Sequence, residues 1–119
     1  MKITRFEDID GWKLGRQLTK KVYDVSKVGE FQSDYGLKDQ IRRAAGSVMH
    51  NIAEGFDSGG NTEFARFLRY SQRSGSEVQS QLYVALDQGY ISEHEFNHLY
   101  ELAREAKNKV GGFIAYLNK

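Results

Sequence analysis

Hydrophobic side chains recur at intervals of three or four residues in four stretches of the chain, at residues 9–28, 36–56, 62–88 and 93–117. Such intervals place apolar side chains on one face of a helix. The fourth stretch is the most regular, because its intervals alternate between three and four from Phe96 to Leu117 without a break. This is the heptad pattern of helices that pack side by side. No stretch alternates with period two for long enough to predict a strand, so the pattern predicts four helices with these ranges.

Short glycine-containing segments separate the four stretches, at residues 33–36, 57–61 and 89–92. Gly89 suits the left-handed conformation that follows a helix, and Ser92 with Glu95 has the spacing of a capping box. Short connections force consecutive helices to lie antiparallel. The predicted fold is therefore all-α, an antiparallel up-down-up-down four-helix bundle.

Composition narrows the class of protein further. The chain has 119 residues, no proline, no cysteine, and 17 basic against 16 acidic side chains. This length predicts one domain, residues 1–119. Without cysteine there is no disulfide scaffold, thiolate zinc site or cysteine nucleophile. No apolar run approaches the roughly 20 residues of a membrane span, and the N-terminal residues lack the apolar stretch of a signal peptide. We therefore expect a cytoplasmic protein with no membrane partner.

The second and third helical stretches carry a recognisable motif. Residues 35–45 have the sequence YGLKDQIRRAA, followed by Ser47-Val48 and by NIAEGF at residues 51–56. This block resembles the bacterial four-helix-bundle proteins encoded in intervening sequences of 23S ribosomal RNA genes. The similarity continues through residues 63–92 and includes Trp12 in the first helix, so it covers nearly the whole chain.

The resemblance implies a fold and a mode of action. The family is similar to the accessory variability protein of diversity-generating retroelements, a pentameric bundle whose basic surface engages reverse transcriptase and nucleic acid. By resemblance, this chain is expected to be a homopentamer and an adaptor for RNA or for a nucleic-acid-handling protein. Relatives often have a proline where this chain has Met49-His50, so the second helix is predicted to run unkinked from Gly36 to Phe56.

Residues 94–98 form a literal H-E-x-x-H motif, the spacing with which metalloproteases hold zinc and place a general base. Here the motif occupies the first turns of the fourth helix, where Glu95 is needed for the capping box. At about 100° per residue, His94 and His98 point away from the predicted core. We favour exposed histidines, with a surface zinc site that also uses Glu101 as the alternative.

Other catalytic constellations are missing from the sequence. It has no Walker loop, no dinucleotide-binding glycine pattern, and no pair of Glu-x-x-His motifs. Glu54 and Glu77 are the acids nearest to inward-facing positions of the middle helices, where hydrogen bonding to Arg42, Arg43 or core serines is the simpler role. We predict a protein that is not an enzyme, with no catalytic residues, metal or cofactor.

Basic residues gather on the polar faces of three predicted helices. Residues 1–73 hold 13 basic and 10 acidic groups (+3), whereas residues 74–119 hold 4 and 6 (−2). Local clusters of this kind neutralise phosphates even when the net charge is small. The alternative is that they are only the solvated face of amphipathic helices. The candidate nucleic-acid-binding residues are Lys13, Arg16, Lys20, Lys27, Arg42, Arg43, Arg66, Arg69 and Arg73.

Several aromatic residues fall outside the predicted core stripes. Aromatic side chains are enriched in protein interfaces, so we favour a subunit contact, with ordinary half-buried tyrosines and base stacking as alternatives. The candidate interface residues are Trp12, Tyr23, Tyr70, Tyr83 and Tyr100.

Two functions follow from these features. The first is an RNA-associated oligomeric adaptor that acts through its basic helical surface. The second is a structural or protein-interaction module that oligomerises and does not bind nucleic acid. Metal-dependent hydrolysis is the least favoured.

Overall fold

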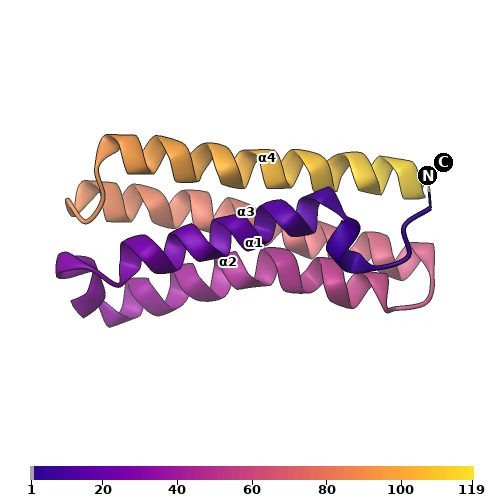
Figure 1. Ribbon diagram of the computed structural model, residues 1–119, viewed down its shortest axis with the longest axis horizontal. Helices are drawn as coiled ribbons and strands as arrows, with labels where there is room; N and C mark the ends of the chain where they lie inside the picture. The colour runs from indigo at the N-terminus through magenta and orange to yellow at the C-terminus, as the bar shows by residue number, and fades with distance from the viewer. Residues whose placement is uncertain (1) are drawn as a thin grey trace.

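The computed structural model describes residues 2–119, which form four long helices and no strand. Consecutive helices run in opposite directions, and both ends of the chain lie at the same end of a bundle that measures 45 × 22 × 19 Å (Figure 1). The all-α four-helix fold predicted from the hydrophobic pattern is confirmed. The helices are α1 (Asp10–Ser26), α2 (Tyr35–Phe56), α3 (Asn61–Asp87) and α4 (Glu93–Leu117).

Helix boundaries differ from the expected ranges mainly at the end of α1. This helix ends at Ser26 instead of residue 28, because Val28 is extended and Gly29 adopts a left-handed conformation with φ +60°. A 3₁₀ helix, η2 (Gly29–Ser33), then leads into α2, and another, η1 (Phe6–Asp8), precedes α1; neither was predicted. The other boundaries shift by one residue at most, and α2 continues without interruption through Met49-His50.

The caps predicted around the start of α4 are confirmed, and α2 has a further cap that the sequence did not indicate. Ser92 and Glu95 form a complete capping box, and Gly89 has φ +74°. The side chain of Asp34 accepts a hydrogen bond from the backbone N–H of Leu37 at 3.1 Å, which caps α2. These bonds satisfy backbone N–H groups that have no partner within the helix.

Each helix packs against two neighbours. α1 and α3 each contact both α2 and α4, so α1 and α3 lie diagonally across the bundle. The predicted apolar positions fill the centre, as Ile41, Val48 and Leu99 show with 1% exposure or less. Because α1 and α3 are diagonal, their outer faces point in opposite directions.

Small residues let α3 approach both of its neighbours. The hydroxyl of Ser71 is buried and donates a hydrogen bond of 2.7 Å to the carbonyl oxygen of Val48 in α2. A Cβ atom on Gly75 would lie 2.7 Å from Cγ of Lys107 in α4. Ser71 and Gly75 thus permit close contacts of α3 with α2 and α4.

The end of the bundle opposite the termini is closed by residues from two connections. The Tyr90 hydroxyl donates a 2.9 Å hydrogen bond to Asp34, and the Tyr90 ring stacks on buried Phe31 at 5.2 Å. Because the hydrogen bond favours the protonated phenol, it raises the pKa of Tyr90, with burial contributing less.

Candidate nucleic-acid interface

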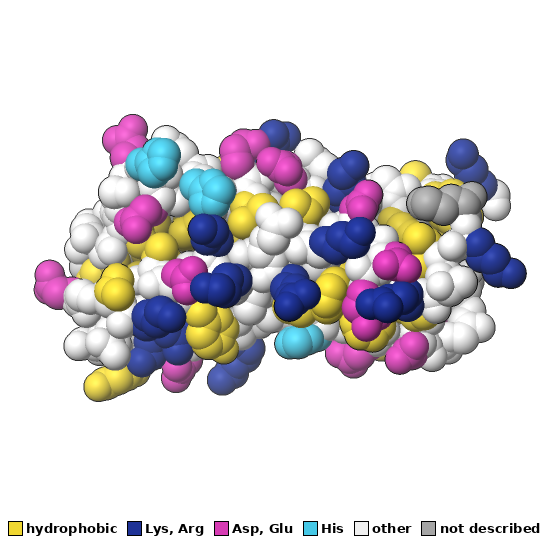
Figure 2. Space-filling model, viewed as in Figure 1, with side chains coloured by type: hydrophobic (Ala, Val, Ile, Leu, Met, Phe, Trp, Pro, Cys, Tyr) yellow, Lys and Arg dark blue, Asp and Glu magenta, His cyan; other side chains and the backbone are white. Residues whose placement is uncertain are grey.

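The structure divides the predicted basic residues between two sides of the bundle. Those of α1 and α2 lie on neighbouring helices, whereas Arg66, Arg69 and Arg73 lie on the outer side of α3, across the bundle from α1. Figure 2 shows Lys and Arg side chains in a band across the middle of the face on which α1 and α2 lie. The sequence therefore predicted two surfaces that the tertiary structure does not join.

Ion pairs neutralise some of these cations. Lys20 and Lys27 both approach Asp24, at 2.9 and 3.6 Å, and the hydrogen bond from Lys20 lowers the pKa of Asp24. Among residues 2–119, Lys13, Arg16, Arg42 and Arg43 have no carboxylate within 4.0 Å. These four cations keep their charge available for a ligand.

A line of aromatic and basic side chains follows the groove between α1 and α2, and we call it the α1–α2 strip. The two helices approach closely here, since a Cβ atom on Gly15 would lie 3.1 Å from Cβ of Met49. The strip consists of Trp12, Arg16, Thr19 and Tyr23 from α1 and of Arg42, Arg43, Gly46 and His50 from α2.

Arg42 is fixed in place within the strip. Its Nε donates a 2.8 Å hydrogen bond to the hydroxyl of Ser26, which is fully buried. Its guanidinium carbon lies 4.4 Å from the ring centroid of Tyr23, a cation–π contact. Arg42 thus joins the two helices while its terminal nitrogen atoms stay free of hydrogen bonds to residues 2–119.

Two hollows interrupt the strip. One, of about 440 Å³, is lined by side chains of both helices, including Tyr23, Arg42, Arg43 and His50, with Asp39 as its acidic member. The other, of about 670 Å³, is lined by α1 side chains around Trp12 and by Arg5 and Glu7 from the segment before α1. The Trp12 ring lies 5.9 Å from the guanidinium carbon of Arg16. Tyr23 is exposed and Trp12 is half-buried. Accessible rings beside unpaired cations are the combination with which proteins hold single-stranded nucleic acid.

Of the three α3 arginines, only Arg66 has a carboxylate partner in the described part of the chain. Arg66 makes two hydrogen bonds to Glu63, at 2.7 and 2.8 Å, and a third to the Tyr70 hydroxyl. The pair with Arg66 lowers the pKa of Glu63 and raises that of the guanidinium. Arg73 lies over the Tyr70 ring at 5.6 Å. Arg66 is therefore neutralised by Glu63, whereas Arg69 and Arg73 have no carboxylate within 4.0 Å among residues 2–119.

The aromatic residues proposed as one interface lie on three different faces. Trp12 and Tyr23 belong to the α1–α2 strip, and Tyr70 sits among the α3 arginines. Tyr83 and Tyr100 pack with Phe96 between α3 and α4, with ring centroids 4.8 to 5.9 Å apart. We call these three residues the α3–α4 aromatic cluster. The five predicted interface residues therefore do not form one continuous patch.

The H-E-x-x-H motif has the surroundings of a helix start. His94 and His98 are exposed and border a surface hollow with Asp24 and Lys21 of α1. Glu101, the third ligand considered, accepts hydrogen bonds from Arg104 that lower its pKa. Within residues 2–119 no three His, Asp or Glu side chains come close enough together to hold a metal ion.

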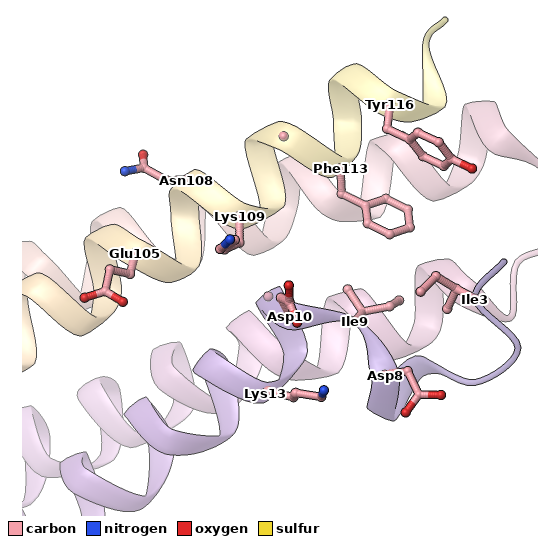
Figure 3. Close-up of a pocket in the computed structure, with 12 residues that line it drawn as sticks. Ile3, Asp8, Ile9, Asp10, Lys13, Glu105, Asn108, Lys109, Phe113 and Tyr116 are labelled. Carbon is pink, nitrogen blue, oxygen red and sulfur yellow. The ribbon is translucent and has the colours of Figure 1, made fainter. Parts of the chain in front are cut away.

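A hollow of about 840 Å³ lies between the start of α1 and the second half of α4. In Figure 3, Ile9, Phe113 and Tyr116 line the end near the termini, and Asp10 and Lys109 face one another across the groove. Its acids are all exposed to solvent. The acids of this groove therefore lack the burial with which active sites often tune an acid or a base.

Comparison with known proteins gives the chain its family. A family model described as 23S rRNA-intervening sequence protein matches residues 7–112. The chain belongs to this family. The resemblance inferred from the YGLKDQIRRAA block is confirmed, and the family description names no enzymatic activity.

A solved structure shows the same fold. It is the crystal structure of a protein of unknown function from the S23 ribosomal protein family of Bacteroides thetaiotaomicron. It superimposes with a TM-score of 0.79 over 87% of this chain and 97% of that chain, at 16% identity. At that identity the similarity concerns the fold alone. No curated protein matches this chain.

Three residues of the strip were not candidates from the sequence: Thr19, Gly46 and His50. Ser26, the buried partner of Arg42, was not a candidate either. His50 follows Arg42 and Gly46 at intervals of four, which places all three on one side of α2. Glu54 and Glu77, expected to bond Arg42, Arg43 or core serines, are exposed, and Arg42 bonds Ser26 instead. None of the helices within residues 2–119 has the length and apolarity needed to cross a membrane.

Proposed function

We propose that this member of the 23S rRNA-intervening sequence protein family is a non-enzymatic RNA-binding adaptor of the bacterial cytoplasm. The observation that carries the proposal is the α1–α2 strip, where cations without carboxylate partners lie beside the exposed ring of Tyr23 and the half-buried ring of Trp12. Phosphate contacts supply most of the affinity of such surfaces, and rings supply stacking. The family likeness adds support, since the accessory variability protein to which it is similar engages nucleic acid.

The strip predicts how strongly binding depends on salt. Each neutralised phosphate of a single strand contributes a slope of about −0.7 in log affinity against log salt. Four cations without an ion pair to residues 2–119 count here: Arg16, Arg42 and Arg43 of the strip, and Lys13, which lines the same hollow as Trp12. Together they give a slope of about −2.8, or a loss of about 50-fold between roughly 50 and 200 mM salt.

Fluorescence anisotropy with a labelled structured RNA tests the proposal. Arg16→Glu with Arg43→Glu should abolish binding at low salt. Arg69→Glu with Arg73→Glu is the matched control, because it reverses the same number of charges on the opposite side of the bundle, where neither arginine has an ion pair. No binding by the wild type at about 50 mM salt refutes RNA binding, and equal loss in both double variants refutes the assignment to the strip.

The α3–α4 aromatic cluster favours self-assembly as a second element of the function. Tyr83 is 50% exposed although its ring packs against those of Phe96 and Tyr100, and exposed, ordered aromatic groups are typical centres of protein interfaces. We propose that copies associate through this cluster, with the pentamer implied by the family resemblance as the expected assembly.

Native mass spectrometry separates assembly from RNA binding. Tyr83→Ser with Tyr100→Ser should yield monomers, whereas Tyr70→Ser, on another face, should leave the assembly intact. A wild-type monomer at micromolar concentration contradicts the proposed assembly. If the protein assembles but binds no RNA, the protein-interaction module is the better description of its function.

A further inference from the structure

The hollow of about 440 Å³ in the α1–α2 strip has features that phosphate binding alone does not need. Exposed, flexible cations are sufficient to neutralise the phosphates of a duplex. Here a tyrosine ring and a guanidinium are held together in a recess, at 4.4 Å. Resting on the RNA-binding function proposed above, we infer that this hollow takes an unpaired nucleotide, and that the protein prefers single-stranded or bulged RNA to a duplex.

The first argument is the rigidity of the Tyr23–Arg42 pair. The Nε of Arg42 donates a hydrogen bond to the hydroxyl of Ser26 in α1, a residue with 0% exposure. This bond fixes the guanidinium before any ligand arrives, so little side-chain entropy remains to be lost on binding. Its terminal nitrogens make no hydrogen bond within residues 2–119 and present a fork to an acceptor.

The second argument is the exposed surface of the pair. Tyr23 is 45% exposed although Arg42 covers part of its ring. Unpaired bases stack on aromatic rings and on guanidinium planes, whereas bases within a duplex keep their faces against one another. The exposed Tyr23–Arg42 stack can therefore bind the face of a base only when that base is unpaired and unstacked from an RNA helix.

The third argument is the distribution of charge around the hollow. Arg43 and His50 are exposed donors on its rim, and Asp39 is the single acidic lining residue. Phosphate oxygens are attracted to Arg43 and His50 and repelled by Asp39. The Asp39 carboxylate can instead accept hydrogen bonds from the amino and imino groups of bases. These charges orient a nucleotide with its phosphate near Arg43 and its base edge near Asp39.

The test compares one labelled RNA as a single strand and as a blunt duplex, by anisotropy at fixed low salt. Tyr23→Leu removes the ring and should weaken binding of the single strand about tenfold or more, with less than about a twofold change for the duplex. Tyr23→Phe should retain single-strand affinity. Tyr116→Leu is the matched control, because this tyrosine is similarly exposed, at 55%, but lies at the far end of α4.

A second pair of variants tests the anchored arginine. Ser26→Ala releases the guanidinium and Arg42→Lys keeps the charge without the fork, and both should lower single-strand affinity more than duplex affinity. Circular dichroism checks that each variant is folded, and Tyr23→Leu, at a half-exposed position, provides the answer if the Ser26 or Arg42 variants unfold.

Failure of this inference is distinguishable from failure of RNA binding. If the wild type binds strand and duplex equally and Arg16→Glu with Arg43→Glu abolishes both, RNA binding stands and the nucleotide site is wrong. Equal losses of strand and duplex affinity in Tyr23→Leu overturn the inference as well. If the wild type binds neither RNA, both proposals fall.

Discussion

The substitution Gly→Ala is expected to have opposite effects at two helical glycines of this protein. At Gly55 of α2, an added Cβ atom would lie 2.7 Å from Cβ of Phe67 and 2.8 Å from Cδ1 of Phe64 in α3. At Gly112 of α4, no heavy atom lies within 4 Å of the new Cβ. Comparing the two variants separates two effects on stability: the higher helix propensity of alanine, and the steric overlap where two helices approach closely.

The magnitudes follow from these distances. In a helix interior alanine is favoured over glycine by about 1 kcal/mol, so Gly112→Ala should raise the free energy of unfolding by about 0.5 to 1 kcal/mol. Gly55 is the penultimate residue of α2, where the propensity gain is smaller. Because a Cβ atom cannot rotate away, α3 must shift to relieve the overlap. Such overpacking costs about 1 to 3 kcal/mol, so Gly55→Ala should be destabilising by about 1 to 2 kcal/mol.

Urea unfolding followed by far-ultraviolet circular dichroism measures both changes. The denaturant dependence of the free energy should be the same in the wild type and both variants, since the surface exposed on unfolding is nearly unchanged. A melting temperature about 4 °C lower per kcal/mol lost should accompany the change in Gly55→Ala. A Gly55→Ala protein as stable as the wild type, or a Gly112→Ala protein less stable than it, refutes the reasoning.

Three further substitutions test single hydrogen bonds. Ser92→Ala removes the capping box of α4 and should lower the free energy of unfolding in urea by about 1 kcal/mol; an unchanged unfolding midpoint contradicts a stabilising cap. Ser71→Ala removes a buried hydroxyl that bonds the main chain of α2 and should cost about 1 kcal/mol in thermal unfolding, whereas a gain in stability means that this bond is dispensable. Tyr90 donates to Asp34, which raises its pKa in the folded protein above the unfolded value. Its stabilisation is therefore complete below the unfolded pKa of about 10 and is lost as the pH rises through the folded pKa. Absorbance titration should show one late-ionising tyrosine that Tyr90→Phe removes, and an identical titration in the variant would disprove the assignment.

Local signals in the sequence predicted most of the fold. The spacing of apolar residues located four helices, and the Ser92 and Glu95 pair located the start of α4, because both depend on residues within two turns of each other. The end of α1 was predicted two residues too late, because Val28 fits the helical spacing. In the structure the chain turns at the left-handed Gly29, so Val28 lies outside the helix and is exposed. The two 3₁₀ helices have no comparable periodicity to reveal them.

The candidate site depended on contacts that no local pattern contains. The sequence by itself determined which side chains on each helix are polar, and hence that Arg16, Arg42 and Arg66 are away from the core. Only the tertiary structure decided that Arg16 and Arg42 share the α1–α2 strip while Arg66 lies across the bundle. It also decided that Arg42 is anchored by Ser26, 16 residues earlier in the chain. The physical reason is that periodicity fixes directions about a single helix axis, whereas neighbours are chosen when the four apolar faces close around a common core.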